Sequence, residues 1–220
     1  MDLFEDYSDI ELMSLADKYD TTSTGAIAST FDREFFIQQN KMRTNPKSFI
    51  PILEDYIKRF DSTGYIVSRD GKPRLRTQEG VAAVREAIEF LKTQAPVPAL
   101  VWNHKLAQAA KDHVNAQGPT GQTGHNDPDG TTMVQRVQKY GTYRMVSENI
   151  HYGDSDPMWA MLMLVIDDGV PSRGHRVNMF RSALEQTGCG TGPHTRYGQM
   201  TNCDYAQSFV SNGRLMDLLI

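Results

Sequence analysis

Hydrophobic residues recur every three or four positions along much of this chain, a pattern typical of helices that bury one face. In residues 46–60 the apolar side chains share one face, and Pro51 is expected to bend the segment because it lacks a backbone donor. Segments with this pattern are predicted to be helices: 9–20, 31–43, 46–60, 78–95, 104–117, 132–140, 158–167 and 172–178.

Polar residues that can accept hydrogen bonds from a first helical turn precede several of these segments. The expected caps are Asn45, Thr77, Asn103, Thr131 or Thr132, Asp156 and Ser172. Gly141 is expected at the end of the short helix that starts at Thr131 or Thr132, where glycine is common.

The pattern changes to strict alternation at residues 144–152. A strand there places Val146, Glu148, Ile150 and Tyr152 on one side. A carboxylate in an otherwise apolar row must find a partner or change its pKa. Glu148 is therefore a candidate functional residue.

The last part of the chain, residues 184–210, is glycine-rich and predicted to form strands. Cys189 and Cys203 lie on successive strands, and the sequence leaves open whether they are bonded. Residues 61–76 are predicted to be a polar turn region or an insertion.

Composition places the chain among ordinary globular proteins, with 39% hydrophobic content, and 220 residues are enough for one hydrophobic core but do not require two domains. A net charge of -4 argues against nucleic-acid binding, which needs a basic surface. No run of about 18 apolar residues predicts a transmembrane segment.

The first 30 residues are acidic, with seven acids against one base, so the remaining residues carry a net +2. This start does not resemble a secretory signal, and two cysteines are too few for a dense disulfide framework. An intracellular protein, cytoplasmic or cytoskeleton-associated, is therefore expected. A signal peptide removed upstream would instead make it extracellular.

Residues 20–31 have the outline of an EF-hand loop, with oxygen-bearing side chains at positions one, three and five and glycine at six. Position twelve is Phe31 rather than a bidentate glutamate, and Asp20 is the only carboxylate among the ligand positions. Calcium binding is not expected. The segment is either a degenerate EF-hand or a linker that matches by chance.

His125, Glu148 and His175 are the candidate catalytic or ligand-binding residues. Two imidazoles and a carboxylate suit a zinc site, and an imidazole can also act as an acid or base near neutral pH. Histidines this far apart are not specific evidence, and the H-E-x-x-H spacing of zinc proteases is absent. His113, on a buried helical stripe, is expected to be a hydrogen-bonded core residue.

Several fragments, taken in order, resemble the CAP superfamily, which includes cysteine-rich secretory proteins, antigen 5 and plant pathogenesis-related proteins. They are Asn40–Arg43, Leu100–Ala110, Gly124–His125, Ser147–Ile150 and Gly174–Phe180. The resemblance covers about residues 32–210.

This resemblance implies an α+β fold: an α-β-α sandwich with a small antiparallel sheet between helical layers. Residues 1–30 would be an acidic N-terminal extension, and residues 31–220 a CAP domain with a helical insertion at about 46–95. The family's cleft of two histidines and two acids maps onto His125, His175, Glu148 and, for the second acid, Asp168, with Asp167 as the alternative. The resemblance suggests zinc, bound by His125 and His175, as the first ion to test.

The expected function is that of a non-catalytic intracellular structural or interaction protein that keeps a cleft for a divalent metal or small ligand. Its partners would be other proteins, reached through the acidic extension and the insertion. The alternatives are a secreted protein, a metal-dependent hydrolase-like enzyme or a lipid-binding protein. Lipid binding rests on a Met- and Leu-rich segment at residues 158–164, which a buried helix explains equally well.

Overall fold

The computed structural model describes residues 29–67, 73–153 and 156–212. The helix predicted at residues 9–20 and most of the EF-hand-like loop lie outside these ranges. Of that loop, Phe31 lies in the first turn of helix α2 (Thr30–Thr44), which Ser29 caps by accepting from the backbone N–H of Asp32.

A four-stranded sheet forms the centre of the domain. Its order is β3 (Val101–Trp102), β6 (Gln186–His194), β7 (Gly198–Gln207) and β5 (Met145–Tyr152), so β5 is an edge strand. The pairs β5–β7 and β6–β7 are antiparallel, whereas the short β3 pairs in parallel with β6. The alternation at residues 144–152 therefore correctly predicts a strand.

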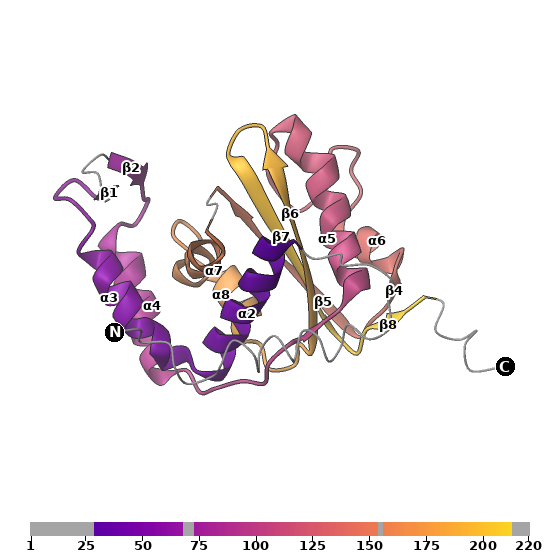
Figure 1. Cartoon of the computed structure of the whole chain (residues 1–220), viewed down its shortest axis with the longest axis horizontal. Helices are drawn as coiled ribbons and strands as arrows, with labels where there is room; N and C mark the ends of the chain where they lie inside the picture. Colours follow the sequence, from indigo (N-terminus) through magenta and orange to yellow (C-terminus); the bar gives the residue numbers. More distant parts are fainter. Residues whose placement is uncertain (1–28, 68–72, 154–155, 213–220) are drawn as a thin grey trace.

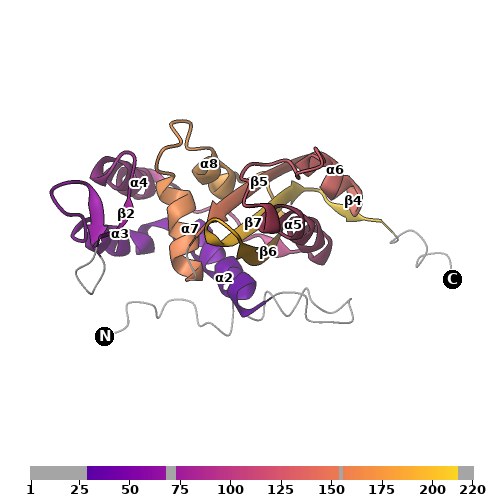
Figure 2. The same ribbon diagram turned by 90° about the horizontal axis from the view of Figure 1, so that it is seen from above.

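Helices cover both faces of the sheet, as Figures 1 and 2 show. Helices α5 (His104–Gln117) and α6 (Met133–Gln138) lie on one face, and α2, α7 (Pro157–Ile166) and α8 (Gly174–Phe180) lie on the other. The larger hydrophobic core is on the α2 and α7 side, and a smaller one joins α5 and α6 to the sheet. The predicted α-β-α sandwich is confirmed.

Glycines on β6 allow α5 to lie directly against the sheet. Gly188 and Gly190 share the face that α5 covers, as residues two apart in a strand must. A Cβ atom at Gly188 would lie 2.1 Å from the backbone nitrogen of Ala107, and one at Gly190 would lie 2.8 Å from Lys111 Cα. The glycine content of this strand thus has a packing cause.

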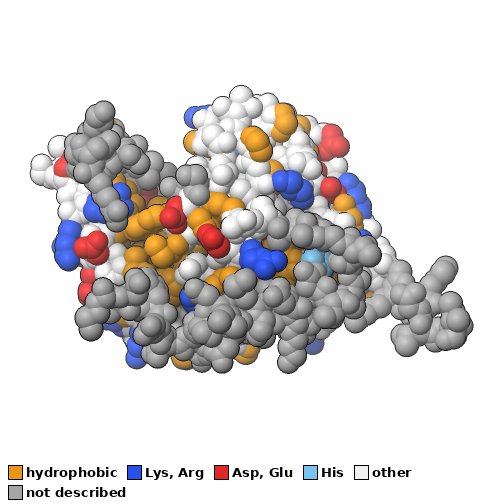
Figure 3. All heavy atoms as spheres, in the orientation of Figure 1, with side chains coloured by type: hydrophobic (Ala, Val, Ile, Leu, Met, Phe, Trp, Pro, Cys, Tyr) orange, Lys and Arg blue, Asp and Glu red, His pale blue; other side chains and the backbone are white. Residues whose placement is uncertain are grey.

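The described part of residues 46–95, the expected insertion, forms an outer unit beside α7 (Figure 1). Its elements are η1 (Pro46–Phe49), α3 (Ile50–Ile57), β1 (Tyr65–Val67), β2 (Pro73–Arg76) and α4 (Val81–Thr93). Strands β1 and β2 pair antiparallel, so the region predicted as turns contains a two-stranded sheet. Hydrophobic side chains gather between this unit and the rest of the domain, with acidic side chains beside them (Figure 3).

Two prolines divide the segment predicted as one bent helix. Pro46 stands in the first turn of η1 and Pro51 in the first turn of α3, positions where the missing N–H has no helical partner to lose. Asn45 precedes η1 but makes no side-chain capping bond. The prolines therefore begin two helical segments rather than bend one.

Three predicted caps are present. Asn103 caps α5, Thr132 forms a capping box at the start of α6, and Asp156 accepts from the first turn of α7. Gly141 does not end α6, which stops at Gln138. It begins β4 (Gly141–Thr142), which pairs with β8 (Val210–Ser211).

Besides Asn45, two predicted caps are wrong. The Thr77 hydroxyl donates to the carbonyl of Gly64, and Gly80 precedes α4. Ser172 is not the cap of α8. Arg173 stands there in a left-handed conformation, and the carboxylate of Asp167 accepts from the first turn instead.

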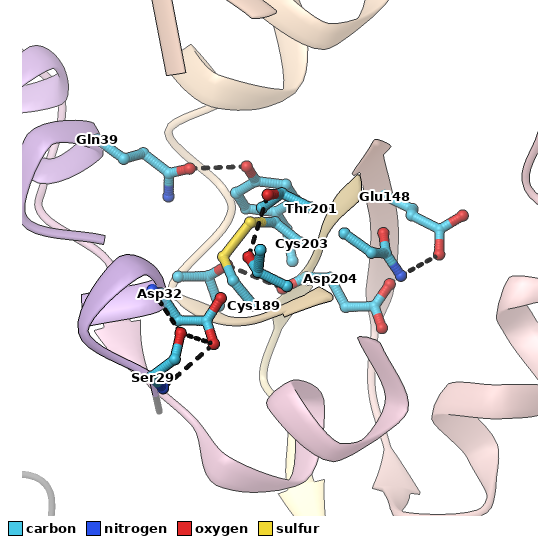
Figure 4. The surroundings of a disulfide bond; sticks show 12 residues. Ser29, Asp32, Gln39, Glu148, Cys189, Thr201, Cys203 and Asp204 are labelled. Atoms are coloured by element: carbon cyan, nitrogen blue, oxygen red, sulfur yellow. Dashed lines mark hydrogen bonds between the residues drawn. A yellow bond between two sulfur atoms is a disulfide. The ribbon is translucent and has the colours of Figure 1, made fainter. Parts of the chain in front are cut away.

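A disulfide joins the two central strands. Cys189 and Cys203 are register partners on β6 and β7, and their sulfur atoms are bonded (Figure 4). The bond lies on the α2 face, towards Gln39, whereas Glu148 and Asp204 extend on the other side. In the parts of the chain that the structure describes, no helix has the length and apolar character to cross a membrane.

Candidate functional site

Glu148 is buried in the middle of β5, and every oxygen of its carboxylate has a partner. Its side chain is only 1% exposed. Oε2 accepts from Arg136 Nη2 at 2.6 Å and from Asn202 Nδ2 at 2.9 Å, and Oε1 lies 2.7 Å from His125 Nδ1. A carboxylate can only accept, so His125 Nδ1 carries the proton in this contact.

The contact between Glu148 and His125 shifts the pKa of each residue towards its charged form. Burial raises the pKa of Glu148, but the hydrogen bond from His125 and the charge of Arg136 outweigh it, so the pKa lies below its ordinary value. The hydrogen bond to Glu148 in turn raises the pKa of His125. The His125 side chain is 57% exposed, so an anchored imidazole stands open to solvent.

Arg136 connects this pair to the loop that carries His125. The guanidinium is fully buried, and it donates to Asp127 Oδ1 at 2.9 Å and to the carbonyl of His125 at 3.1 Å. Asp127 also faces the buried ring of His113, whose Nδ1 lies 2.5 Å from Oδ1. His113 is thus the hydrogen-bonded core histidine that its position predicts, and the network fixes the loop.

Asp204 is a buried acid that the sequence did not single out. It pairs with Glu148 across β5 and β7, and it is fully buried. Neither oxygen of its carboxyl group has a hydrogen-bond partner among the described residues. Burial first, and then the charge of Glu148, raise the pKa of this carboxyl group well above its ordinary value.

His175 forms a second histidine–acid pair at the start of α8. Its Nδ1 lies 2.6 Å from Asp167 Oδ1, and Asp167 Oδ2 accepts from the backbone N–H groups of His175 at 3.0 Å and Arg176 at 3.4 Å. The Asp167 side chain is 1% exposed and that of His175 is 23% exposed. The arrangement repeats that of His125 and Glu148.

Asp168, the preferred second acid, does not face either histidine. Its carboxylate accepts from the backbone N–H groups of Gln78 and Glu79, each at 2.7 Å. Asp167 follows α7 with a φ of 58°, so the chain turns there and directs the two side chains to different neighbours. Asp167, the alternative that the sequence left open, is therefore the acid that contacts His175.

The two pairs contact adjacent residues of the edge strand β5. The ring of His125 contacts the side chain of Glu148, and the next residue, Asn149, donates from Nδ2 to the carbonyl of His175 at 3.0 Å. Asn178 in turn donates to Asn149 Oδ1 at 2.9 Å, which holds α8 against the strand. The structure thus brings both predicted histidines to one segment of one strand.

Each of the two histidines presents one imidazole nitrogen that could bind a metal. Nε2 of His125 and of His175 has no hydrogen-bond partner within the described ranges, whereas the carboxylates of Glu148 and Asp167 are occupied by donors. In those ranges no cluster of three or more His, Cys, Asp or Glu side chains is arranged to hold a metal. Carboxylates that orient a histidine through its other nitrogen are, however, the usual second shell of a metal-binding imidazole.

The helix with many Met and Leu residues, α7, contributes to the core. Met161, Leu162 and Leu164 are buried in the main hydrophobic cluster, as the simpler of the two interpretations predicts.

The sequence of the chain matches one known protein family. The model of the cysteine-rich secretory protein family, CAP, matches residues 39–205. The chain belongs to the CAP family. The match includes the insertion and all four residues of the two histidine–acid pairs. No curated protein is similar enough to this CAP chain to count as a match.

Several solved structures resemble the domain at low sequence identity. An extracellular SCP-domain protein of Bacillus anthracis is 20% identical over 57% of this chain, with a TM-score of 0.42, and the match spans only 38% of that protein. An outer surface protein of Borrelia burgdorferi is 17% identical (58% of this chain, 90% of that one, TM-score 0.44). Venom allergen-like protein 4 of Schistosoma mansoni is 14% identical (82% and 90%, TM-score 0.44).

Proposed function

We propose that this CAP domain is a non-catalytic binding protein whose cleft takes a divalent cation, with zinc the first to test. The cation would bind Nε2 of His125 and His175. The observation that carries the proposal is that a buried carboxylate holds Nδ1 of each ring, at 2.7 Å and 2.6 Å. A proton fixed on Nδ1 leaves the lone pair on Nε2, where a metal needs it.

The surrounding charges favour a cation. Glu148 and Asp167 contact the rings directly, and orienting carboxylates raise the basicity of the imidazoles that they hold. Two imidazoles fill two of the four positions that zinc usually occupies, so water or donor atoms of a bound partner would fill the rest.

The occupied acids also support binding rather than catalysis. A general base needs an oxygen that can reach the substrate's proton. Both oxygens of Glu148 already accept hydrogen bonds, and one of the donors, Arg136, is fully buried with it. Asp167 is likewise committed to His175 and to the first turn of α8.

We propose an oxidising compartment for the protein, in place of the intracellular location expected from the acidic start. Disulfides persist in secreted and cell-surface proteins and are rare in the cytosol. The Cys189–Cys203 bond includes both cysteines of the chain and lies in the centre of the sheet. A docking role for the acidic extension stays a prediction, because that segment lies outside the described residues.

Calorimetric zinc titration at neutral pH tests the proposal. The His125→Ala, His175→Ala double variant is expected to lose binding. A matched His104→Ala, His151→Ala variant, which also removes two imidazoles, is expected to keep it. Equal binding by the native protein and the cleft variant would show that the proposal is wrong.

The acids provide a graded second test. Glu148→Gln and Asp167→Asn leave both imidazoles in place but weaken the groups that orient them. Each is expected to reduce zinc affinity by about 10–100-fold, the usual effect of removing a second-shell partner.

A further inference from the structure

We propose that the insertion positions the His175 pair, with Arg173 as the positioning residue that Glu79 and Glu86 hold. The effect on ligand affinity rests on the proposed function of the cleft, whereas the effect on the His175 ring does not. Figure 2 shows the turn that follows α7 rising between α4, which carries Glu86, and α8, which carries His175.

Two edges of the Arg173 guanidinium donate to the expected insertion. Nη1 and Nη2 donate to Oε1 and Oε2 of Glu79, each at 2.7 Å. Nε donates to Glu86 at 3.0 Å, and Nη2 donates to the same carboxylate at 2.5 Å. Two bidentate contacts on one side chain fix its direction as well as its position.

The same guanidinium reaches the acid that orients His175. Arg173 Nη1 donates to the carbonyl of Asp167 at 2.8 Å and to that of Val170 at 3.2 Å. Asp167 is the residue whose carboxylate holds both the ring and the backbone N–H of His175. The contacts therefore run from the insertion through Arg173 to Asp167 and then to the ring.

The backbone on either side of this turn is fixed from the insertion too. The Asp168 carboxylate accepts from the backbone N–H groups of Gln78 and Glu79, and the N–H of Gly169 donates to Glu79 Oε1 at 2.8 Å. Asp168, which the sequence assigned to the cleft, thus contacts the expected insertion.

Arg173 itself has an unusual backbone conformation. Its φ of 50° lies in the left-handed region, which a residue with a Cβ atom seldom adopts. Residues in such conformations persist where the surrounding structure holds them, and they gather at functional sites. Here the holding contacts come from Glu79 and Glu86, some 90 residues earlier in the chain.

Arg176 adds a second connection from Glu86 to α8. Its Nη1 donates to Glu86 Oε1 at 3.0 Å, and its Nε and Nη2 donate to the carbonyls of Val165 and Ile166 at the end of α7. Glu86 thus lies between two arginines that flank His175. Hydrogen bonds from Arg173 lower the pKa of Glu79 to about 2, and they lower that of Glu86 as well, so both acids are charged at neutral pH.

Nuclear magnetic resonance of the histidine side chains tests the proposal without any ligand. Long-range proton–nitrogen spectra at pH 8 report which ring nitrogen carries the proton. In the native protein His175 is expected to be protonated on Nδ1 alone. In a Glu79→Gln, Glu86→Gln variant it is expected to become a mixture of tautomers, while His125, held by Glu148, keeps its native signal.

A matched variant separates this effect from a general loss of charge. Glu54→Gln with Glu89→Gln removes two exposed acids from the same insertion, and Glu89 pairs with its helical neighbour Lys92. Its His175 signal is expected to stay native. Arg173→Lys, which keeps the charge but cannot bind both acids bidentately, is expected to alter His175 and provides a second variant if the double one folds poorly.

Zinc titration of the same variants links the positioning to affinity. We expect the Glu79→Gln, Glu86→Gln variant to bind about tenfold more weakly, the lower end of what an outer-shell change costs. Unchanged His175 spectra in both Arg173→Lys and the double variant would overturn the proposal. If the native protein binds no zinc, the proposed function fails, and the ring spectra still decide whether the insertion positions His175.

Discussion

Replacement of Arg136 by methionine should destabilise the domain strongly. The guanidinium is fully buried between two acids, at 2.6 Å from Glu148 Oε2 and 2.9 Å from Asp127 Oδ1, and it also donates to the carbonyls of His125 and Thr131. Methionine has similar length but no donor. The change therefore leaves two poorly exposed carboxylates without their shared cation.

Breaking a buried ion pair by removal of one partner costs about 3–5 kcal/mol, because the remaining charge is not compensated. For a protein of this size each kcal/mol lowers the melting temperature by about 2–4 °C, so a decrease of about 6–20 °C is expected. Glu148 keeps its contacts with His125 and Asn202, which places the free-energy change nearer the lower value.

Urea unfolding followed by tryptophan fluorescence measures this change, with Arg144→Met as the matched control. Arg144 is exposed, and exposed substitutions usually change the free energy of unfolding by no more than about 0.5 kcal/mol. If Arg136→Met unfolds within about 1 kcal/mol of the native protein, the charge network does not fix the loop that carries His125 as described.

Three further predictions concern pH, the disulfide and the sheet. Because the folded protein raises the pKa of His125 through Glu148, the stability from this pair should be fully present below about pH 6.5 and fall as pH rises through the folded pKa; thermal melts from pH 5.5 to 9 should show this loss, and it should be absent in His125→Ala. Reduction of the Cys189–Cys203 bond, which closes a loop with a sequence separation of 14, should lower the free energy of unfolding by about 3 kcal/mol in urea titrations with and without reductant; an unchanged midpoint would contradict this. Gly188→Ala places a Cβ atom 2.1 Å from the α5 backbone and should cost about 1–3 kcal/mol by the same assay, so a neutral result would mean that α5 does not lie so close to β6.

Much of the fold could be predicted because local patterns and tertiary contacts agree. The alternation of side chains around Glu148 is typical of a strand, and β5 is one. Asn103 and Thr132 each precede a helix whose first turn needs hydrogen-bond acceptors, and both cap it. The hairpin of β1 and β2 was missed because its Gly- and Pro-containing sequence is equally typical of turns. Short strands have too few residues to show a period.

The partners of the site could not be predicted, since they depend on which strands become neighbours. Asp204 is buried beside Glu148 only because β7 lies between β5 and β6, and no local pattern marks it as different from an exposed acid. The choice between Asp167 and Asp168 depends on a positive φ at a residue other than glycine, which the sequence does not signal. The pairing of Arg173 with Glu79 and Glu86 joins segments about 90 residues apart.

Anomalous diffraction at the zinc edge, from crystals of the intact chain grown with zinc, tests the cleft most directly. The account predicts a peak at about 2.0–2.1 Å from Nε2 of His125 and of His175, with both Nδ1 atoms still bound to Glu148 and Asp167. A zinc peak on other side chains only, or no peak at the two rings, would contradict it.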